Sequence, residues 1–499
     1  MGNRFGRATK TGHILLWSAV GVCLAAIMRS QPPDRTCAIV TGIAYGAAVL
    51  YTRYFLQIRF LEIPELWLLA LGIFHLGLVV PWAIGLYDAW NTWWLGRADL
   101  PSAFFLFVLA LVSYQIGLII ATTKPAAVRA TAERQVVREL DNRTLFLAGV
   151  LLMAVSGAMY LVGFWQTFGS GVSSLVYADM YQVVMETDSR VLGVGLLVFP
   201  MALYVAAAGA TRKQLFAVFG IAGLWAIWQL FLGYRSRGFL IVIIALYIAA
   251  KKRFSIPRRV LIAIVVAAAY VIPLVSIVRV EATGERFSKG LLQDVNPLNG
   301  FAEMGQAIWP LAETYRLVGP NQFRHGRTYL SAFNRAVPNI GRGFTPGKRL
   351  QEINIEDSPA YWFVLATEPY LFHLNLGRGF SAVAEAYMNF GVWGVVAIFS
   401  VLGYGLVRLE RFSTRSVFSL AAVAVVLDPA LWAVRNDFSV FTRSAVWGCS
   451  FVFLVWWLAS KFVGESKRAV GSPKGEVLKE RVLCRAAGER PVRGELAGR

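Results

Sequence analysis

Long apolar runs recur along the chain and are separated by short polar segments. The runs approach about 20 residues, the length at which a helix crosses the hydrocarbon core of a bilayer. The pattern predicts twelve spans, at about 13–29, 36–56, 63–86, 102–122, 144–164, 190–210, 215–232, 238–250, 260–278, 382–407, 416–434 and 444–462. We therefore expect an all-α polytopic membrane protein with about 12 transmembrane helices.

The composition supports a membrane location. Of the 499 residues, 57% are hydrophobic and only 16% are charged, whereas about 25% of the residues in soluble domains are charged. A net charge of +20 would indicate nucleic acid in a soluble chain, but a membrane protein retains basic loops in the cytoplasm. We expect no nucleic-acid partner. The cysteines Cys23, Cys37, Cys449 and Cys484 are scattered and predict neither a disulfide nor a metal site.

The positions of Lys and Arg predict the orientation of the spans. With a cytoplasmic N-terminus, the cytoplasmic segments and the two termini hold 30 of the 49 basic residues, and the outer segments hold 8 apart from one long loop. Because basic loops stay inside, both termini are predicted to be cytoplasmic. We expect 124–143 to form a short helix on the inner leaflet and the basic tail 463–499 to be disordered.

One loop divides the chain into parts. Residues 1–278 carry spans one to nine, 279–378 form a long outer loop with short helices, and 379–462 carry spans ten to twelve. The loop holds thirteen Phe, Trp and Tyr residues, so it is not a solvated linker. Helical spacing predicts one helix over 301–315, bent at Pro310, and a second near Tyr329 that ends before Pro338.

Six arginines lie at the outer ends of the predicted spans, where the positive-inside rule disfavours them. They are Arg235, Arg237, Arg279, Arg378, Arg435 and Arg443. A guanidinium is a planar fork of donors that matches phosphate oxygens, so the set predicts a diphosphate-binding site. The alternative for each one alone is contact with lipid phosphate or with a neighbouring acid, such as Asp437 beside Arg435.

The stretch 377–394 begins in polar chain and ends in apolar chain, which predicts a loop entering a membrane helix. If that helix begins near Arg378, then Arg378, Ser381, Glu385 and Asn389 follow steps of three and four residues and share one face. A charged face at the end of a span needs water, protein or a ligand. The alternative is a solvated helix end with glycine packing notches.

The same stretch has the pattern Gly-x-Gly-x-Ser-x-x-x-Glu-x-Tyr-x-Asn-Phe-Gly-x-x-Gly. It resembles the signature of bacterial oligosaccharide repeat-unit polymerases, the Wzy-type O-antigen polymerases. The turns Ser236-Arg237-Gly238 and Arg435-Asn436-Asp437, and the long loop before the last spans, are also similar to this family. The first six spans carry no motif of it.

The resemblance implies a GT-C-like glycosyltransferase of the bacterial inner membrane. It would polymerise undecaprenyl-diphosphate-linked oligosaccharide repeat units, of O-antigen or exopolysaccharide, at the periplasmic face and without a metal ion or other cofactor. Membrane lipid, a chain-length regulator and a flippase are the implied partners. The alternatives are an O-antigen ligase, which shares the donor chemistry, and a transporter or flippase of lipid-linked sugars. A transporter predicts charges or helix breaks at mid-membrane depth, whereas polarity here collects at one face.

Glycosyl transfer is helped by a general base that accepts the proton of the attacking hydroxyl. The outer-side candidates are Glu385, His373 and Asp437, with Glu368 as a fourth. Glu385 would lie near Arg378, which would keep it ionised, although a purely structural contact between them is the alternative. His75 lies in an apolar run and is expected to have no catalytic role.

Overall fold

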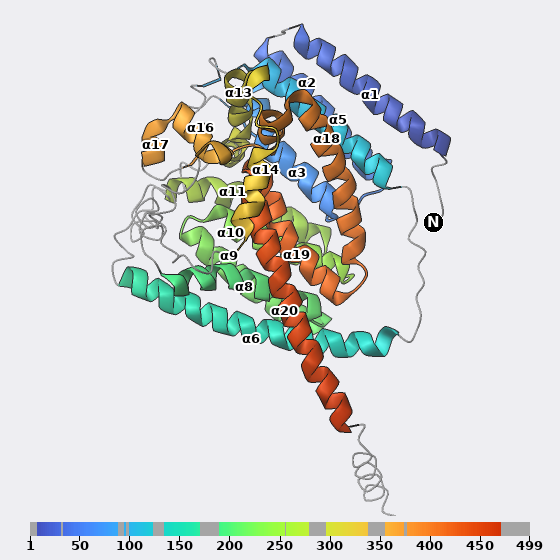
Figure 1. Cartoon of the computed structure of the whole chain (residues 1–499), viewed down its shortest axis with the longest axis vertical. Coiled ribbons are helices and arrows are strands. Elements are labelled where there is room, and N and C mark those ends of the chain that lie inside the picture. Colours follow the sequence, from blue (N-terminus) through green and yellow to red (C-terminus); the bar gives the residue numbers. More distant parts are fainter. Residues whose placement is uncertain are drawn as a thin grey trace, which may run out of the picture.

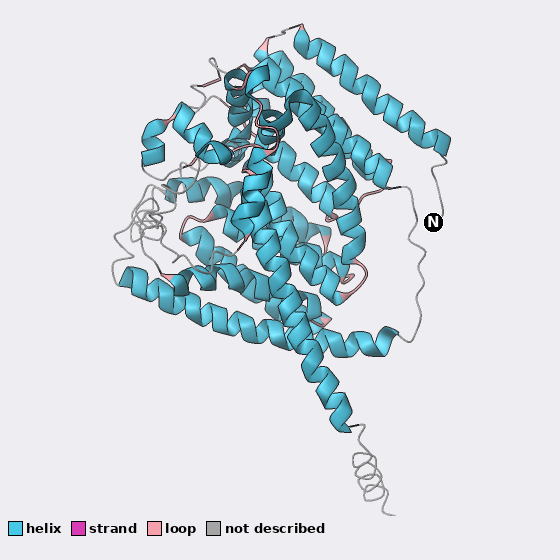
Figure 2. Ribbon diagram, viewed as in Figure 1, coloured by secondary structure: helices cyan, strands magenta, loops and turns pink. Residues whose placement is uncertain are grey.

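The structure is a computed structural model that describes residues 7–30, 33–87, 94–95, 99–122, 134–169, 189–254, 256–278, 296–337, 355–373 and 377–470. Within these ranges all regular secondary structure is helical and no strand occurs (Figure 2). The prediction of an all-α protein is confirmed.

The predicted spans coincide with long helices. They are α1 (Arg7–Arg29), α2 (Asp34–Tyr54), α3 (Ile63–Leu76) with α4 (Val79–Ala83), α5 (Leu100–Ala121), α6 (Arg134–Phe168), α8 (Arg190–Gly209), α9 (Arg212–Phe231), α10 (Arg235–Lys251), α11 (Arg258–Val278), α18 (Ala382–Ser413), α19 (Val417–Trp432) and α20 (Phe438–Val470). Shorter elements lie between α11 and α18, namely α12 (Pro297–Met304), η4 (Gly305–Ala307), α13 (Ile308–Leu317), η5 (Pro320–Gln322), α14 (Arg327–Ala336), η6 (Ile355–Asp357), α16 (Pro359–Thr367) and α17 (Pro369–His373), and η7 (Ala433–Arg435) follows α19.

Eight helices in the described part of the chain are long and apolar enough to cross a membrane. These helices are α1, α5, α6, α8, α9, α18, α19 and α20. The chain is therefore a multi-pass membrane protein. The other four predicted spans fall on α2, on α3 with α4, on α10 and on α11, so the total of twelve and the outer position of the long loop stay predictions.

Two helix pairs pack at close range because glycines face them. A Cβ on Gly149 of α6 would lie 2.4 Å from the Ala206 nitrogen of α8, and one on Gly117 of α5 would lie 2.1 Å from the Ser400 oxygen of α18. Lipid tails are as apolar as side chains, so membrane helices associate through such close backbone packing. Figure 1 shows α1 and α6 at opposite edges of the bundle, with α3, α18 and α19 between them.

The described parts of the long loop pack on the helix bundle. Trp447 of α20 donates its Nε1–H to the Ala336 oxygen over 2.8 Å, and a Cβ on Gly305 would lie 2.1 Å from the Leu78 nitrogen. The predicted helix ending before Pro338 is confirmed as α14. The predicted bend at Pro310 is wrong in position, since the break is η4 and Pro310 lies in the first turn of α13, where a proline removes no helical hydrogen bond.

Two predicted boundaries also differ. α6 runs without a break from Arg134, so the second half of the expected surface helix is continuous with the next span, and 124–133 lie outside the described residues. No Gly or Pro interrupts this part of α6, which favours one long helix. α20 continues to Val470, so 463–470 are helical, and the remainder of the predicted tail lies outside the described residues.

Polar contacts join the helix ends that were predicted to be cytoplasmic. Lys251 of α10 forms an ion pair with Glu410 of α18, and the same carboxylate accepts a hydrogen bond of 3.1 Å from the Ile63 nitrogen. Lys252 donates to the Ala208 oxygen at 2.6 Å, and burial lowers the pKa of its ammonium to about 8. These contacts fasten the bundle at the end away from the long loop.

Candidate functional site

Ser381 sets the start of α18. Its backbone is extended at φ −144°, and its Oγ accepts a hydrogen bond of 3.3 Å from the Ala384 nitrogen, as an N-cap does. Arg378 therefore precedes the helix and does not share a helical face with Glu385. The predicted alignment of these two residues is wrong. Serine favours the N-cap position over the helix interior, so the helix starts after Ser381.

Arg378 is held by Glu368, which follows α16. Its Nε and Nη2 donate to the two carboxylate oxygens at 2.8 and 2.9 Å. The hydrogen bonds to Glu368 raise the pKa of Arg378 above its usual value. The Arg378 side chain is 38% exposed, whereas that of Glu368 is 6% exposed. The pair thus fixes the orientation of the guanidinium while leaving part of it accessible.

A backbone contact joins the Arg378 turn to the Arg435 turn. The Phe380 N–H donates to the Arg435 carbonyl over 2.8 Å. Gly379 has φ +79°, and a Cβ there would lie 2.7 Å from the same carbonyl. Only glycine adopts this backbone without strain and allows the two chains to approach so closely. Two of the predicted diphosphate-binding arginines are thus brought together.

Glu385 is buried at the meeting point of three segments. Its carboxylate accepts from the Thr328 hydroxyl at 2.7 Å and from the Phe438 nitrogen at 2.6 Å. The residue is 2% exposed. Glu385 therefore ties the long loop, through Thr328, and the start of α20, through Phe438, to the first turns of α18.

Asn389 ties the same loop to α18 one turn further along. It accepts from the Gly326 nitrogen at 3.0 Å and donates to the Thr328 hydroxyl at 2.7 Å. Two residues later Gly391 has φ +64°, and α18 is kinked there. A Cβ at Gly391 would lie 2.7 Å from the Phe323 ring. The signature residues after Ser381 thus build the joint between α18 and the loop.

Asp437 lies at the start of α20 and is 3% exposed. Its carboxylate accepts from the Ala360 nitrogen at 3.4 Å and from the Ser439 hydroxyl at 2.5 Å. It thus binds the first turns of α16 and α20 together. His373 is the last residue of α17, and its side chain lies outside the described residues, as does Arg279.

Arg235 and Arg237 lie in the first turn of α10. Arg235 is 9% exposed and forms an ion pair with Glu303 of α12, and Arg237 lies over the Tyr234 ring at 4.8 Å from its centre. Arg443 of α20 lies over the Trp447 ring at 5.1 Å. The prediction that Arg235 and Arg237 form one diphosphate-binding site with Arg378 and Arg435 stays a prediction.

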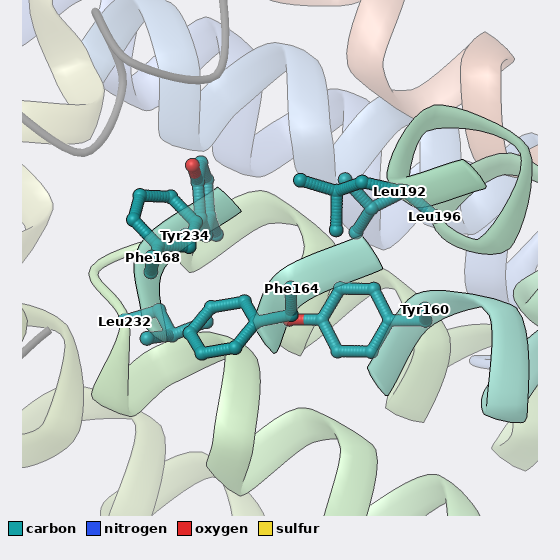
Figure 3. Close-up of a pocket in the computed structure, with 7 residues that line it drawn as sticks. All are labelled: Tyr160, Phe164, Phe168, Leu192, Leu196, Leu232 and Tyr234. Atoms are coloured by element: carbon teal, nitrogen blue, oxygen red, sulfur yellow. The ribbon is translucent and has the colours of Figure 1, made fainter. Parts of the chain in front are cut away.

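An apolar hollow adjoins the Arg235 turn (Figure 3). It is small and partly open, and it is lined by Tyr160, Phe164, Phe168, Leu192, Leu196, Leu232 and Tyr234. These residues come from the end of α6, the start of α8 and the α9–α10 turn. All of these helix ends were predicted to lie on the outer side, so the hollow and the Arg-bearing turn belong to the same end of the bundle.

Sequence reasoning missed two residues that hold this site, Thr328 and His75. Thr328 is 1% exposed and contacts both Glu385 and Asn389. The His75 Nε2 lies 2.8 Å from the Ser381 Oγ. A lone threonine in a loop and a lone histidine in an apolar run give no sequence signal of such contacts.

Comparison with known proteins supports one family. The search of solved structures found no significant match. Protein CapE of Staphylococcus aureus is 24% identical over 306 residues, which cover 58% of this chain and 62% of CapE. The chain thus spans about three fifths of the length of this relative. The family model described as O-antigen polysaccharide polymerase Wzy matches residues 37–467. Because this match covers most of the sequence, including the arginine turns and α18, the chain belongs to the Wzy family of O-antigen polysaccharide polymerases.

Proposed function

We propose that this polymerase joins undecaprenyl-diphosphate-linked oligosaccharide repeat units at the periplasmic face by glycosyl transfer that needs no metal ion. Family membership supports polymerisation of repeat units. The observation that carries the proposed site is the joined pair of turns at Arg378 and Arg435. The spans on either side of the long loop would form the membrane body, and 279–378 would be the periplasmic cover of the site.

The reaction forms one bond and breaks one bond. A sugar hydroxyl of the incoming repeat attacks the anomeric carbon of the growing chain. The bond from that carbon to the lipid diphosphate breaks, the diphosphate leaves as an anion, and the hydroxyl proton passes to a base. Charge therefore develops on the phosphate oxygens, where preorganised donors lower the barrier.

We assign Arg378 and Arg435 to the leaving diphosphate. Glu368 engages the Nε and Nη2 edge of Arg378, so the guanidinium is already oriented before substrate binds. A planar fork held in this way can donate two parallel hydrogen bonds to a phosphate. The outer arginines Arg235 and Arg237 would complete the anionic site on the α10 side.

We propose that the apolar hollow of Figure 3 receives the lipid next to the diphosphate. The first isoprenyl units of the polyprenyl chain would lie against its apolar side chains. Tyr234 lines the hollow and also lies under the Arg237 guanidinium, so an apolar wall and a cation meet at one residue. A lipid diphosphate has the complementary arrangement of an apolar chain that ends in an anion.

His373 is our choice for the general base, with Glu385 and Asp437 as positioning residues. Glu385 and Asp437 are almost fully buried and accept hydrogen bonds that hold three segments together. The ion pair between Glu368 and Arg378 fastens the two ends of a short segment that contains His373. His373 at the end of α17 would therefore stay close to the Arg378 turn.

Cells that lack this chain test the proposal. A polymerase defect leaves lipid-linked single repeats at the outer face, and restoring the gene restores the polymer ladder. A ligase defect would instead leave long lipid-linked polymer that is not transferred to its acceptor. A flippase defect would leave single repeats on the cytoplasmic face, where an added periplasmic glycosidase does not cut them.

A further inference from the structure

His75 of α3 contacts the polymerase signature through Ser381, although 306 residues separate the two in the sequence. Both side chains are 0% exposed. The Nε2 of His75 lies 2.8 Å from the Ser381 Oγ, and its Nδ1 lies 3.0 Å from the Leu71 carbonyl oxygen. The histidine therefore bridges its own helix and the cap of α18.

The partners determine which nitrogen carries the proton. A carbonyl oxygen only accepts, so Nδ1 is the protonated nitrogen and donates to Leu71. In the neutral ring Nε2 then accepts from the Ser381 hydroxyl. The Ser381 Oγ keeps a lone pair for the Ala384 nitrogen, which donates to it over 3.3 Å. With a neutral imidazole, every polar atom in this buried hydrogen-bond network has a partner.

The segment that Ser381 anchors is connected to both arginines that we assign to the diphosphate. Phe380 precedes Ser381, and its N–H donates a hydrogen bond to the Arg435 carbonyl. Arg378 lies three residues before Ser381. We propose that His75 is a positioning residue that fixes the Ser381 cap and thereby the reach of Arg378 and Arg435. This inference rests on the proposed role of these arginines in holding the diphosphate.

Packing alone is the competing explanation. The His75 ring lies 5.5 Å from the Phe107 ring of α5, and a phenylalanine in place of His75 would keep that contact. A packing role thus predicts that His75→Phe is harmless to turnover. A positioning role predicts that turnover falls although the ring is still present, because the Ser381 hydroxyl loses its acceptor.

The test uses full-length protein in membranes and compares His75→Phe, His75→Gln, His75→Asn and Ser381→Ala. Turnover of lipid-linked repeats is divided by the amount of folded protein. We expect His75→Phe to lower turnover about 10- to 100-fold, the scale of a displacement near 1 Å in a reacting site. Gln presents an oxygen near the place of Nε2 and should restore most of the turnover, whereas Asn is too short and should not.

A double variant identifies the route of the effect. If His75 acts through Ser381, His75→Phe with Ser381→Ala should be no slower than the more impaired single variant. His13→Phe is a matched control, since His13 also lies beside an aromatic ring, that of Tyr51, but is predicted to be at the cytoplasmic end, and its turnover should stay at the wild-type level.

Two results would overturn the inference. One is wild-type turnover for His75→Phe, and the other is independent, multiplying losses in the double variant. Arg435→Lys is measured beside these variants to separate the inference from the proposed function. Full turnover of Arg435→Lys together with coupled losses at His75 and Ser381 would refute the diphosphate role and keep His75 as a positioning residue of the cap.

Discussion

Glu385 is either the general base or a buried residue that holds three segments together. Replacing it by Gln and by Ala separates these two roles. The Ala variant leaves the buried Thr328 hydroxyl and Phe438 N–H without their acceptor. Each unpaired buried group costs about 1–3 kcal/mol, so we expect a loss of about 2–6 kcal/mol in the free energy of unfolding.

The Gln variant should be milder. Its oxygen can accept from the Phe438 N–H, and its NH₂ can donate to the Thr328 hydroxyl oxygen. Only the Thr328 hydroxyl proton then loses its acceptor, which costs about 1–3 kcal/mol, whereas the Ala variant leaves two buried groups unpaired. The turnover of each folded molecule should therefore stay within about tenfold of the wild type, a change of about 1.4 kcal/mol in the barrier.

The assay pairs polymer length on gels with thermal unfolding in detergent. Turnover is normalised to folded protein, so a loss of abundance is not counted as a loss of chemistry. If Glu385 were the base, Gln would lower turnover by roughly 10²–10⁴-fold at wild-type stability. That result would refute the positioning role given to Glu385 and remove His373 as the base.

Three further predictions follow from the site and the orientation of the chain. Arg378→Lys keeps the charge but loses the fork, and turnover should fall about 10²-fold or more, the scale for losing one oriented donor, with protein level unchanged; full turnover would contradict the diphosphate role. Leu196→Trp fills the apolar hollow and should impair use of a long-chain polyprenyl donor more than a short-chain one, whereas Leu197→Trp on the same helix should affect both equally; equal effects of Leu196→Trp would exclude the lipid site. Topology reporters should be active on the cytoplasmic side at Lys467 and on the periplasmic side at Thr345, and the reverse pattern would overturn the orientation.

The helices were predictable because a helix that crosses the bilayer needs an apolar run of about 20 residues. Every predicted span falls on a helix, or on two in the case of α3 and α4, and Arg235, Arg378 and Arg435 stand at helix ends as expected. The start of α18 was not placed correctly, because helical spacing continues through Arg378 and only the cap geometry of Ser381 marks the true beginning.

The partners of the site residues were less predictable than the residues themselves. Arg378 was expected near Glu385 but binds Glu368, which belongs to the long loop. Glu385 instead binds Thr328, 57 residues earlier in the chain. Such contacts depend on how the loop folds back onto α18, and loop conformation leaves no periodic trace in a single sequence.

In the proposed reaction one lipid diphosphate leaves for each sugar linkage formed, without a metal ion. The direct measurement uses the purified chain in lipid nanodiscs with lipid-linked single repeats and excess chelator. We expect polymer, with one undecaprenyl diphosphate released per new linkage, and loss of both in Arg378→Lys. Polymer formation that stops in chelator, or that proceeds without equimolar release of the lipid diphosphate, would contradict it.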